Sequence, residues 1–401
     1  MIYGNAIPKN QVAGMIQRDI EDEVLACARE YPTVTVTGPR QAGKTTLARS
    51  VFPDHSYVSL EQPLTREQFR DDPLGFIDRY REGAVFDEVQ NAPQLLSYLQ
   101  GEFDERQAPG RFILTGSQHF TLSERISQSL AGRTAVLELL PFSIKELCRA
   151  ERLGRNLDEV LWQGAYPPVH DRDLRPSRWY SSYTSTYIDR DVRQISAVHD
   201  LETFHRFMRL AAGNVGQLVN TSRFGNDCGV DHKTIRRWLD ILQASYVAHL
   251  LPPFYRNFRK RVVKTPKLYF FDTGLVCHLL GIHDPQQLDT HPLRGAIFEN
   301  WVFAELCKAL NNRGLPGRMY FWRTHGGQEV DFIVEYGGGV VGIEVKAGMT
   351  PRPALAQPLI NTLQHWPENQ RKAVLVYGGD NRFVSNDCLF LPWREINHVL
   401  Q

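Results

Sequence analysis

The residues with the clearest chemical potential form one short loop near the N-terminus. Gly38-Pro39-Arg40-Gln41-Ala42-Gly43-Lys44-Thr45 matches the pattern G-x-x-x-x-G-K-[ST] at every fixed position, and Thr46 follows it. The glycines let such a loop curl, so that backbone N–H groups point at phosphate oxygens. Lys44 is expected to reach the β- and γ-phosphates of a nucleotide, and Thr45 to place its hydroxyl on a magnesium ion. We therefore predict that this loop binds ATP with Mg²⁺.

Two acidic residues end an apolar run downstream of the loop. The segment Gly83-Ala-Val-Phe-Asp87-Glu88 is typical of a buried strand that finishes in two carboxylates. Asp87 is predicted to hold Mg²⁺ through water, and Glu88 to polarise the attacking water as a general base. The alternative is a pair of acids in a solvated turn. The pairing with the upstream loop favours ATP hydrolysis.

Small polar residues and arginines supply further candidates for the same chemistry. The run from Arg111 to Gln118 is an apolar strand that ends in Thr-Gly-Ser-Gln. Because the carboxyl ends of parallel strands gather at one edge, Ser117 or Gln118 could sense the γ-phosphate, although Ser117 could equally cap a helix. Phosphoryl transfer also favours an arginine near the developing charge. Arg133 is the first candidate and Arg125 the second, the alternative being a surface or salt-bridged arginine.

Strands and helices alternate through the part of the chain that carries these residues. Apolar, β-branched runs at 34–37, 57–60, 84–86, 112–114 and 136–139 are separated by helical patterns. This order predicts an α/β fold with a mostly parallel sheet covered by helices, as in P-loop NTPases. Residues 142–250 are largely helical, and after about residue 293 one helix precedes short strands separated by glycines. We predict three regions, 1–140, 141–290 and 291–401.

The bulk composition excludes several classes of protein. Hydrophobic residues make up 42% and charged residues 23% of the 401 residues, which is ordinary for a globular protein. The net charge is +1, so nucleic-acid binding must come from local patches. The six cysteines form no C-x-x-C pair, which argues against a zinc ribbon. No stretch approaches the roughly 20 apolar residues that span a bilayer and no secretory signal is visible, so we expect a cytoplasmic protein.

A helical unit at 201–250 carries a basic face. The segment Val230-Asp-His-Lys-Thr-Ile-Arg-Arg-Trp-Leu-Asp-Ile-Leu is predicted to form a helix capped by Asp231. The apolar positions that can face inward are Ile235, Leu239 and Leu242, and the basic positions then left to point outward are Lys233, Arg236 and Arg237. This is the arrangement of a helix-turn-helix recognition helix, which predicts DNA binding by a winged-helix domain.

A basic stretch follows that helix. It contains Arg256, Arg259, Lys260, Arg261, Lys264 and Lys267 and no acidic residue, with Tyr255 and Phe258 interleaved. Such a segment suits a wing that contacts DNA phosphates. The alternatives are a solvated hairpin and a docking loop for an acidic partner.

Four residues near the C-terminus have the spacing of a nuclease site. Glu299 lies in a predicted helix, Asp331 in a strand, and Glu344 and Lys346 in the returning strand, where residues i and i+2 share a face. This is the E…D…E-x-K pattern of PD-(D/E)xK, restriction-endonuclease-like folds. Asp331 and Glu344, with Glu299, would bind one or two Mg²⁺ ions, and Lys346 would orient or activate the nucleophile. The alternative is a fold whose site serves only binding or structure.

Taken in order, these segments resemble a widespread prokaryotic family of AAA-type ATPases related to the archaeal ATPases and signalling NTPases. The resemblance is carried by MIQRDIEDEV, VTGPRQAGKTTLA, VFDEVQNAP, FILTGSQ and SLAGRTAVLELLPFS. It continues at Trp179-Tyr180, Tyr187–Asp191, Phe271–Gly274, Gly295–Glu299, Glu329–Asp331 and Glu344–Lys346. The resemblance implies a homo-oligomeric ATPase whose arginines act across subunits, followed by a C-terminal domain of uncharacterised function.

Three functions are compatible with these observations. The first is a Mg²⁺-dependent ATPase that binds DNA and couples ATP turnover to DNA remodelling or translocation, as in branch migration, recombination or repair. The second is an ATP-regulated DNA nuclease in defence. The third is a nucleotide-controlled switch or scaffold that binds protein partners.

Overall fold

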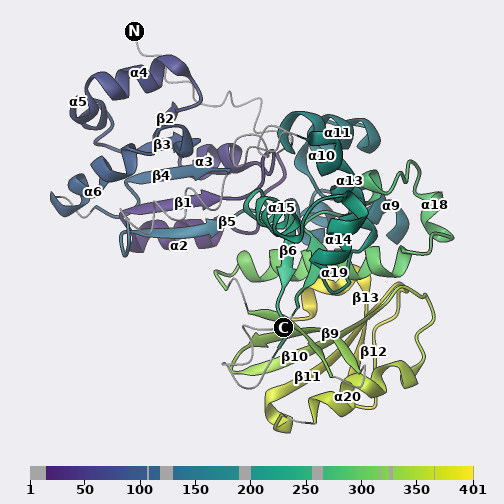
Figure 1. The fold of residues 1–401 in the computed structure, drawn as a ribbon. Helices are drawn as coiled ribbons and strands as arrows, with labels where there is room; N and C mark the ends of the chain where they lie inside the picture. The colour runs from purple at the N-terminus through teal and green to yellow at the C-terminus, as the bar shows by residue number, and fades with distance from the viewer. Residues whose placement is uncertain are drawn as a thin grey trace. The chain divides into compact units, whose positions relative to one another are not determined.

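The computed structural model describes residues 15–105, 108–117, 130–188, 200–254, 265–315, 318–324, 328–364 and 366–400. They form two compact units, which Figure 1 shows as ribbons. The first lies within Met1–Phe142 and includes the short segments Ala244–Tyr246 and Asn311–Gly314. The second contains the rest. The first unit ends close to the predicted boundary at 140, whereas the predicted regions 141–290 and 291–401 fall into one unit.

The first unit is built on a sheet of five strands in the order β2-β3-β4-β1-β5. Their bounds are β1 Thr33–Thr37, β2 Ser56–Ser59, β3 Ala84–Asp87, β4 Phe112–Gly116 and β5 Thr134–Glu138. All neighbouring pairs are parallel, which confirms the predicted fold class. Because β4 lies between β1 and β3, its carboxyl end lies between the glycine-rich loop and the acidic strand end.

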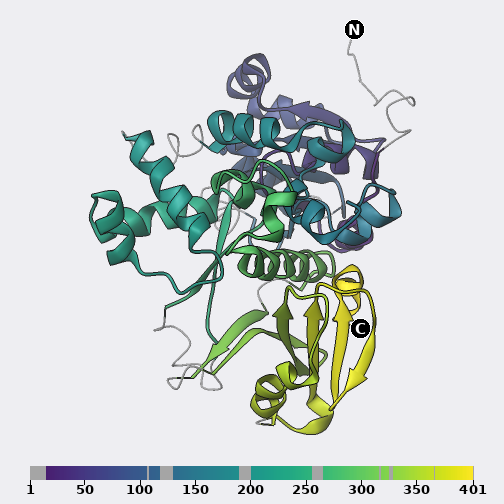
Figure 2. The same ribbon diagram turned by 90° about the vertical axis from the view of Figure 1, so that its right-hand side faces the viewer.

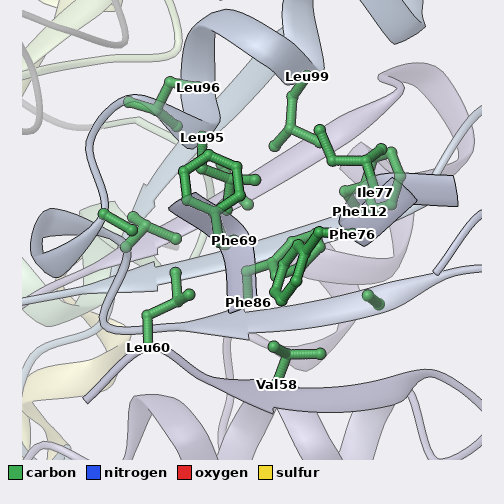
Figure 3. Packing of buried hydrophobic residues seen from close by; sticks show 14 of the residues in the cluster. Val58, Leu60, Phe69, Phe76, Ile77, Phe86, Leu95, Leu96, Leu99 and Phe112 are labelled. Carbon is green, nitrogen blue, oxygen red and sulfur yellow. The ribbon is translucent and has the colours of Figure 1, made fainter. Parts of the chain in front are cut away.

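Helices cover both faces of this sheet. They are α2 Glu21–Glu30, α3 Lys44–Val51, α4 Pro63–Asp71, α5 Pro73–Asp78 and α6 Leu95–Glu105, with the short helix η1 at Val89–Asn91. Successive strand residues point to opposite faces. Phe86 and Phe112 therefore enter one core with residues of α4, α5 and α6 (Figure 3), whereas Val85 and Ile113 enter another with residues of α2 and α3.

The second unit begins with helices and a small hairpin. The elements are α8 Ile144–Arg149, α9 Leu157–Gln163, α10 Pro167–Asp171, α11 Pro176–Tyr183, η2 Thr184–Ile188, α13 Leu201–Gly213, α14 Thr221–Cys228, α15 His232–Ala244, β6 Ala248–Leu251, β7 Lys267–Phe270, α17 Thr273–Leu279 and α18 Gln286–Asp289. The strands β6 and β7 are antiparallel. Residue Leu218 bridges Lys267 on the other side of β7, so a third extended segment joins this hairpin.

The helices α13, α14 and α15 form the compact helical group that the sequence predicts. Phe204 and Phe207 of α13 pack their rings against Trp238 of α15 at centroid distances of 5.5 and 5.4 Å. Asp231 caps α15 by accepting hydrogen bonds from the backbone N–H groups of Lys233 and Thr234 at 2.7 and 2.8 Å. The cap defines where α15 begins, and the aromatic contacts hold α15 against α13.

A mixed sheet of six strands completes the second unit, in the order β12-β13-β11-β10-β9-β8 (Figure 2). The elements are α19 Arg294–Asn311, β8 Met319–Arg323, β9 Glu329–Tyr336, β10 Gly339–Lys346, η3 Pro353–Ala356, α20 Gln357–Leu363, η4 Glu368–Gln370, β11 Arg371–Tyr377, β12 Phe383–Ser385, β13 Cys388–Pro392 and η5 Trp393–His398. Phe332 of β9 packs towards Phe303 of α19, and its neighbour Ile333 enters the core that holds α20. The two helices therefore cover opposite faces of the sheet.

Within the part of the chain that the structure describes, every helix is too short or too polar to cross a membrane.

Asn300 of α19 replaces a missing backbone partner for β7. Its Oδ1 accepts from the N–H of Phe270 at 2.6 Å, and its Nδ2 donates to the carbonyl of the same residue at 3.0 Å. The side chain is fully buried. Asn300 therefore fixes α19 against β7 at both backbone groups of one residue.

We expect Asn300→Ala to lower the free energy of unfolding of the second unit. The change leaves the buried N–H and C=O of Phe270 unpaired, and each such group costs about 1–3 kcal/mol, so a loss of about 2–6 kcal/mol is expected in urea denaturation. The control is Asn361→Ala, since Asn361 is exposed and accepts a hydrogen bond from Gln357, which is also exposed. A change of about 0.5 kcal/mol or less is expected there. Equal losses in the two variants would contradict this role of Asn300.

Candidate functional site

The glycine-rich loop joins β1 to α3 with two glycines in conformations that other residues disfavour. Gly38 has φ +143° and Gly43 has φ +93°. A Cβ on Gly38 would lie 2.1 Å from the carbonyl oxygen of Leu139, so the backbone passes too close for any side chain. The helix α3 begins at Lys44, which directs its positive N-terminal end at the loop. The local structure is that of an anion-binding loop.

Lys44 lies across its own loop. Its Nζ donates to the carbonyl oxygens of Gly38 at 3.0 Å and Pro39 at 2.8 Å, and the side chain is buried. The ammonium group is thus held inside the curl of the loop, where a phosphate group would compete with these carbonyls. Its predicted contact with the β- and γ-phosphates stays a prediction.

Thr45 and Asp87 meet although 42 residues separate them. The hydroxyl of Thr45 donates to Asp87 Oδ1 at 2.8 Å. Mg²⁺ prefers oxygen ligands and is commonly held by one or two protein groups together with substrate phosphates. The two side chains fit such an ion, with ATP supplying the remaining ligands.

Two further hydroxyl groups contact Asp87, and no sequence pattern predicted either contact. Tyr57 of β2 donates to Asp87 Oδ2 at 2.8 Å, and Thr115 of β4 donates to Oδ1. Burial and then the charge of Asp87 raise the pKa of Tyr57, so the phenol stays protonated and remains a donor. Thr115 belongs to the polar strand end that the sequence singled out, whereas nothing in the spacing of Tyr57 pointed to this contact.

Glu88 is held in a strained position beside Asp87. Its backbone is left-handed, with φ 58° and ψ 50°, a conformation that non-glycine residues seldom adopt outside turns and functional sites. Ser117 Oγ lies 2.9 and 3.1 Å from the two carboxylate oxygens of Glu88, and Gln90 also donates to it. Ser117 therefore positions Glu88, while its predicted contact with a phosphate stays a prediction.

Arg133 does not reach the phosphate loop of its own chain. It directly precedes β5, and its carbonyl accepts from the N–H of Thr33, the first residue of β1, at 3.3 Å. The loop follows the other end of β1, five residues further on, or roughly 16 Å at 3.3 Å per residue. A role on the nucleotide of a neighbouring subunit stays a prediction for Arg133. Gln118 and Arg125 lie outside the described residues.

Arg18 contacts the loop, although no motif or spacing in the sequence indicated this role. One guanidinium nitrogen donates to the carbonyl of Ala42 at 2.8 Å and another to the carbonyl of Leu140 at 2.6 Å. The group is buried and lies 4.8 Å from the ring centroid of Phe142. Arg18 therefore ties the loop to the segment that follows β5.

The structure brings the predicted C-terminal residues close together. Lys346 Nζ lies 2.6 Å from Glu344 Oε1, and Asp331 Oδ2 accepts from the N–H of Val345 at 2.9 Å. Burial raises the pKa of Asp331 well above its usual range, and the charges of Glu299 and Glu344 raise it further. A cluster of carboxylates therefore forms on α19, β9 and β10.

Lys267 also enters this cluster, and its prediction as part of a solvent-facing basic wing is wrong. Its side chain is only 4% exposed, and its Nζ lies 3.1 Å from Glu299 Oε1 and contacts the carboxylate of Glu329. Burial lowers the pKa of Lys267, but the charges of Glu299, Asp331 and Glu329 outweigh burial, so the pKa is raised. Lys267 is a protonated, paired cation.

The cluster does not fit the predicted second Mg²⁺ site at Asp331 and Glu344. Among the described residues, no group of three or more His, Cys, Asp or Glu side chains is arranged to hold a metal ion. Lys267 engages Glu299, and Lys346 engages one oxygen of Glu344. The other oxygen, Glu344 Oε2, is buried without a hydrogen-bond partner.

The predicted recognition helix presents its basic residues to solvent. Lys233, Arg236 and Arg237 are exposed on α15, and Ile235, Leu239 and Leu242 are buried, as expected from the sequence. The predicted phosphate contacts Arg256, Arg259, Lys260, Arg261 and Lys264 lie outside the described residues. DNA contact by either set stays a prediction.

Comparisons with known proteins divide the chain into three matched segments. Residues 30–148 match a family described as an AAA domain, and residues 154–286 and 294–396 match two domains of unknown function, DUF8612 and DUF4143. The AAA match contains Lys44, Asp87, Glu88 and Ser117. The chain therefore carries an AAA-type, P-loop ATPase domain.

Curated relatives match nearly the whole chain. The uncharacterized proteins Rv2008c of Mycobacterium tuberculosis and Mb2031c of Mycobacterium bovis are each 31% identical over 379 residues, covering 93% of this chain and 82% of the relative. An uncharacterized protein of Haemophilus influenzae is 24% identical over 210 residues, covering 49% of this chain and 50% of the relative. Among solved structures, the Walker-type ATPase PABY2304 of Pyrococcus abyssi has a TM-score of 0.48 at 14% identity and covers 69% of this chain and 99% of its own.

We expect Arg18→Met to weaken nucleotide binding although Arg18 lies outside the loop. The variant removes the charged hydrogen bonds that hold the carbonyls of Ala42 and Leu140, each worth about 1.5–3 kcal/mol. If half of the free energy of one such bond holds the loop in shape, about 0.75–1.5 kcal/mol, ATP affinity falls about 4- to 13-fold, which titration of a fluorescent ATP analogue measures. Gln17→Met is the control, because Gln17 is the exposed neighbour. Unchanged affinity in Arg18→Met would show that the loop keeps its shape without the arginine.

Proposed function

We propose that this chain, which belongs to the same family as the mycobacterial proteins Rv2008c and Mb2031c, is a Mg²⁺-dependent ATPase that acts on DNA. The observation that carries the ATPase part is the 2.8 Å hydrogen bond between Thr45 and Asp87, within the segment that matches an AAA domain. It joins the phosphate loop to the acidic strand end, and the two features have a known joint use in ATP hydrolysis.

Each residue of the site has one task in hydrolysis. Lys44 and the backbone N–H groups of the loop bind the phosphates, and Thr45 and Asp87 would hold Mg²⁺, which neutralises charge on the β- and γ-phosphates. Glu88 orients the attacking water and accepts its proton. Ser117 and Gln90 hold the Glu88 carboxylate and thereby decide where the water is activated. Tyr57 and Thr115 keep Asp87 turned towards the loop.

The DNA part of the proposal rests on α13 to β7. Helix, extended segment, helix, helix and hairpin follow one another in the order that winged-helix domains use. Lys233 lies one helical turn before the adjacent Arg236 and Arg237, and all three are exposed on the helix that would enter a groove. Cations in this position contact phosphates and steer a protein onto DNA.

We further propose that ATP turnover drives remodelling or translocation of DNA by a cytoplasmic homo-oligomer. In such an assembly Arg133 would act on the nucleotide of a neighbouring subunit, since it lies at the edge of the sheet opposite its own loop. Phosphoryl transfer gains strongly from an arginine supplied by a second subunit. DNA binding without stimulation of the ATPase would instead favour a nucleotide-controlled switch.

We expect Glu88→Gln to retain ATP but to lose turnover by about 10²-fold or more, because it keeps the shape and removes the general base. Lys44→Ala is expected to lose ATP binding itself. Phosphate release is measured with and without single-stranded, duplex and branched DNA. Glu82→Gln is the matched control, since Glu82 is exposed ahead of β3, and its turnover is expected to match the native chain. Absence of ATP binding and phosphate release in the native chain under all these conditions would end the ATPase proposal.

We expect the combined change Lys233→Ala, Arg236→Ala and Arg237→Ala to weaken DNA binding and reduce its salt dependence. Each lost phosphate contact lowers the slope of log affinity against log salt by about 0.9, so a decrease of up to about 3 is expected. Fluorescence anisotropy of labelled duplex DNA at several salt concentrations gives the slope.

The control for the recognition helix removes the same charge elsewhere. Arg172→Ala, Arg175→Ala and Arg178→Ala change three exposed arginines of the same unit that precede and begin α11. The slope of this variant is expected to stay that of the native chain. A slope that falls equally in both variants would mean that overall charge, and not α15, governs the affinity.

A further inference from the structure

We propose that Lys267 is the resident cation of the C-terminal carboxylate cluster and takes the place that a divalent metal ion holds in a nuclease site. The cluster is defined as Glu299, Glu329, Asp331 and Glu344. The cluster thereby fixes the base of the predicted DNA-contacting wing, and the native chain binds no divalent metal ion there.

The contacts of Lys267 are those of a coordinated ion. Its Nζ is shared between the carboxylates of Glu299 and Glu329, and the hydroxyl of Tyr269 lies 3.5 Å away. Tyr269 in turn donates to Glu299 Oε1 at 2.5 Å, so the carboxylate is fixed from two sides. An ammonium group has three protons to donate, and these oxygens offer one acceptor for each. Only 4% of the Lys267 side chain is exposed to solvent, so these oxygens rather than water satisfy its ammonium group.

The backbone of β7 prevents Lys267 from withdrawing easily. Gly216 N donates to the carbonyl of Leu268 at 2.8 Å, and Leu268 N donates to the carbonyl of Gln217 at 3.0 Å. Asn300 bonds both backbone groups of Phe270. These hydrogen bonds hold β7 along its length, and they keep the Lys267 side chain at the carboxylates of Glu299 and Glu329.

A divalent ion would have to displace this lysine. Buried carboxylates need a counter-charge, because an unpaired charge in a buried site is strongly unfavourable. Lys267 supplies that charge from within the chain at an effective concentration that free metal does not match. Without Lys267, Glu299 would lose the cation at its Oε1 and Glu329 would keep only Arg323 at 3.5 Å, next to the unpartnered oxygen of Glu344, and a metal ion becomes the natural replacement.

The position of Lys267 in the chain also indicates a structural role for the cluster. The predicted wing runs from Tyr255 to Lys267, and its residues 255–264 lie outside the described part of the chain. Phe254 N donates to the carbonyl of Phe321 in β8 at 2.6 Å, and Phe321 N donates to the carbonyl of Pro252 at 3.2 Å. The described residues on either side of 255–264 are thus both anchored in the C-terminal part of this unit, Phe254 by backbone bonds to β8 and Lys267 by the ion cluster. The carboxylate cluster would then anchor the strand at the end of the predicted wing instead of cutting DNA.

The test measures binding of Mn²⁺ to the nucleotide-free full chain. The electron paramagnetic resonance signal of free Mn²⁺ decreases as the ion binds. Every sample carries Asp87→Asn, so that the predicted metal ligand of the ATP site does not contribute to Mn²⁺ binding. The chain with Lys267 is expected to bind no Mn²⁺ at millimolar concentration. Lys267→Gln is expected to bind one Mn²⁺ ion per chain, with a Kd at least tenfold below the highest Mn²⁺ concentration at which the Lys267 chain shows no binding. Adding Asp331→Asn is expected to abolish this binding.

Two matched variants separate charge from side-chain loss. Lys267→Arg keeps the positive charge and is expected to bind no Mn²⁺. Lys233→Gln removes an exposed lysine and is expected to gain nothing. Addition of Mn²⁺ is also expected to raise the melting temperature of Lys267→Gln and to leave that of the Lys267 chain unchanged.

Two results would overturn the proposal. One is a Mn²⁺ ion that the chain with Lys267 binds and that Asp331→Asn removes. The other is a folded Lys267→Gln chain that binds no ion. If Lys267→Gln does not fold, the comparison of the Lys267 chain with its Asp331→Asn variant still decides whether a metal ion occupies the cluster. None of these results depends on ATPase activity or DNA binding, so they can fail separately from the proposed function.

Discussion

The parallel register of the first sheet is the constraint on which the ATP site depends. Thr37 pairs with Gly116 and Ser59 with Asp87, so the ends of four strands meet at one edge. The loop after β1 needs glycine because the chain turns at Gly38 against the backbone of Leu139. Once the strand ends are level, hydrogen bonds from Thr45, Tyr57 and Thr115 converge on Asp87 and hold its carboxylate at this edge of the sheet.

The sequence predicted what depends on local pattern. The five strands follow from apolar runs, and their polar ends follow from the rule that parallel strands finish at one edge. Arg18 could not be predicted in this way, because its partners are 24 and 122 residues away. Tyr57 lies on an edge strand, where the alignment with β3 alone decides whether it meets Asp87. The sequence likewise does not show which subunit's nucleotide Arg133 would serve, since a residue just ahead of a strand reaches only the edge at which that strand begins.

The two units treat buried charge in different ways. In the ATP site the acids are paired with hydroxyl groups, which can turn towards a metal ion or a water molecule without a change in net charge. In the C-terminal cluster the acids are paired with ammonium groups from Lys267 and Lys346. Hydroxyl partners leave a carboxylate available for catalysis, whereas ammonium partners satisfy it. The first arrangement suits turnover, and the second suits a fixed joint.

A short sequence pattern is therefore a weaker guide to a metal site than the full charge balance around it. The residues Glu299, Asp331, Glu344 and Lys346 have the types and spacing of a nuclease site, and the sheet does bring them together. What decides their use is a lysine 32 residues before Glu299, on a strand of a different matched segment. Because that lysine is buried between two carboxylates, the cluster holds a cation before any metal arrives. The same carboxylates can serve catalysis in one protein and anchorage in another, according to which cation the fold provides.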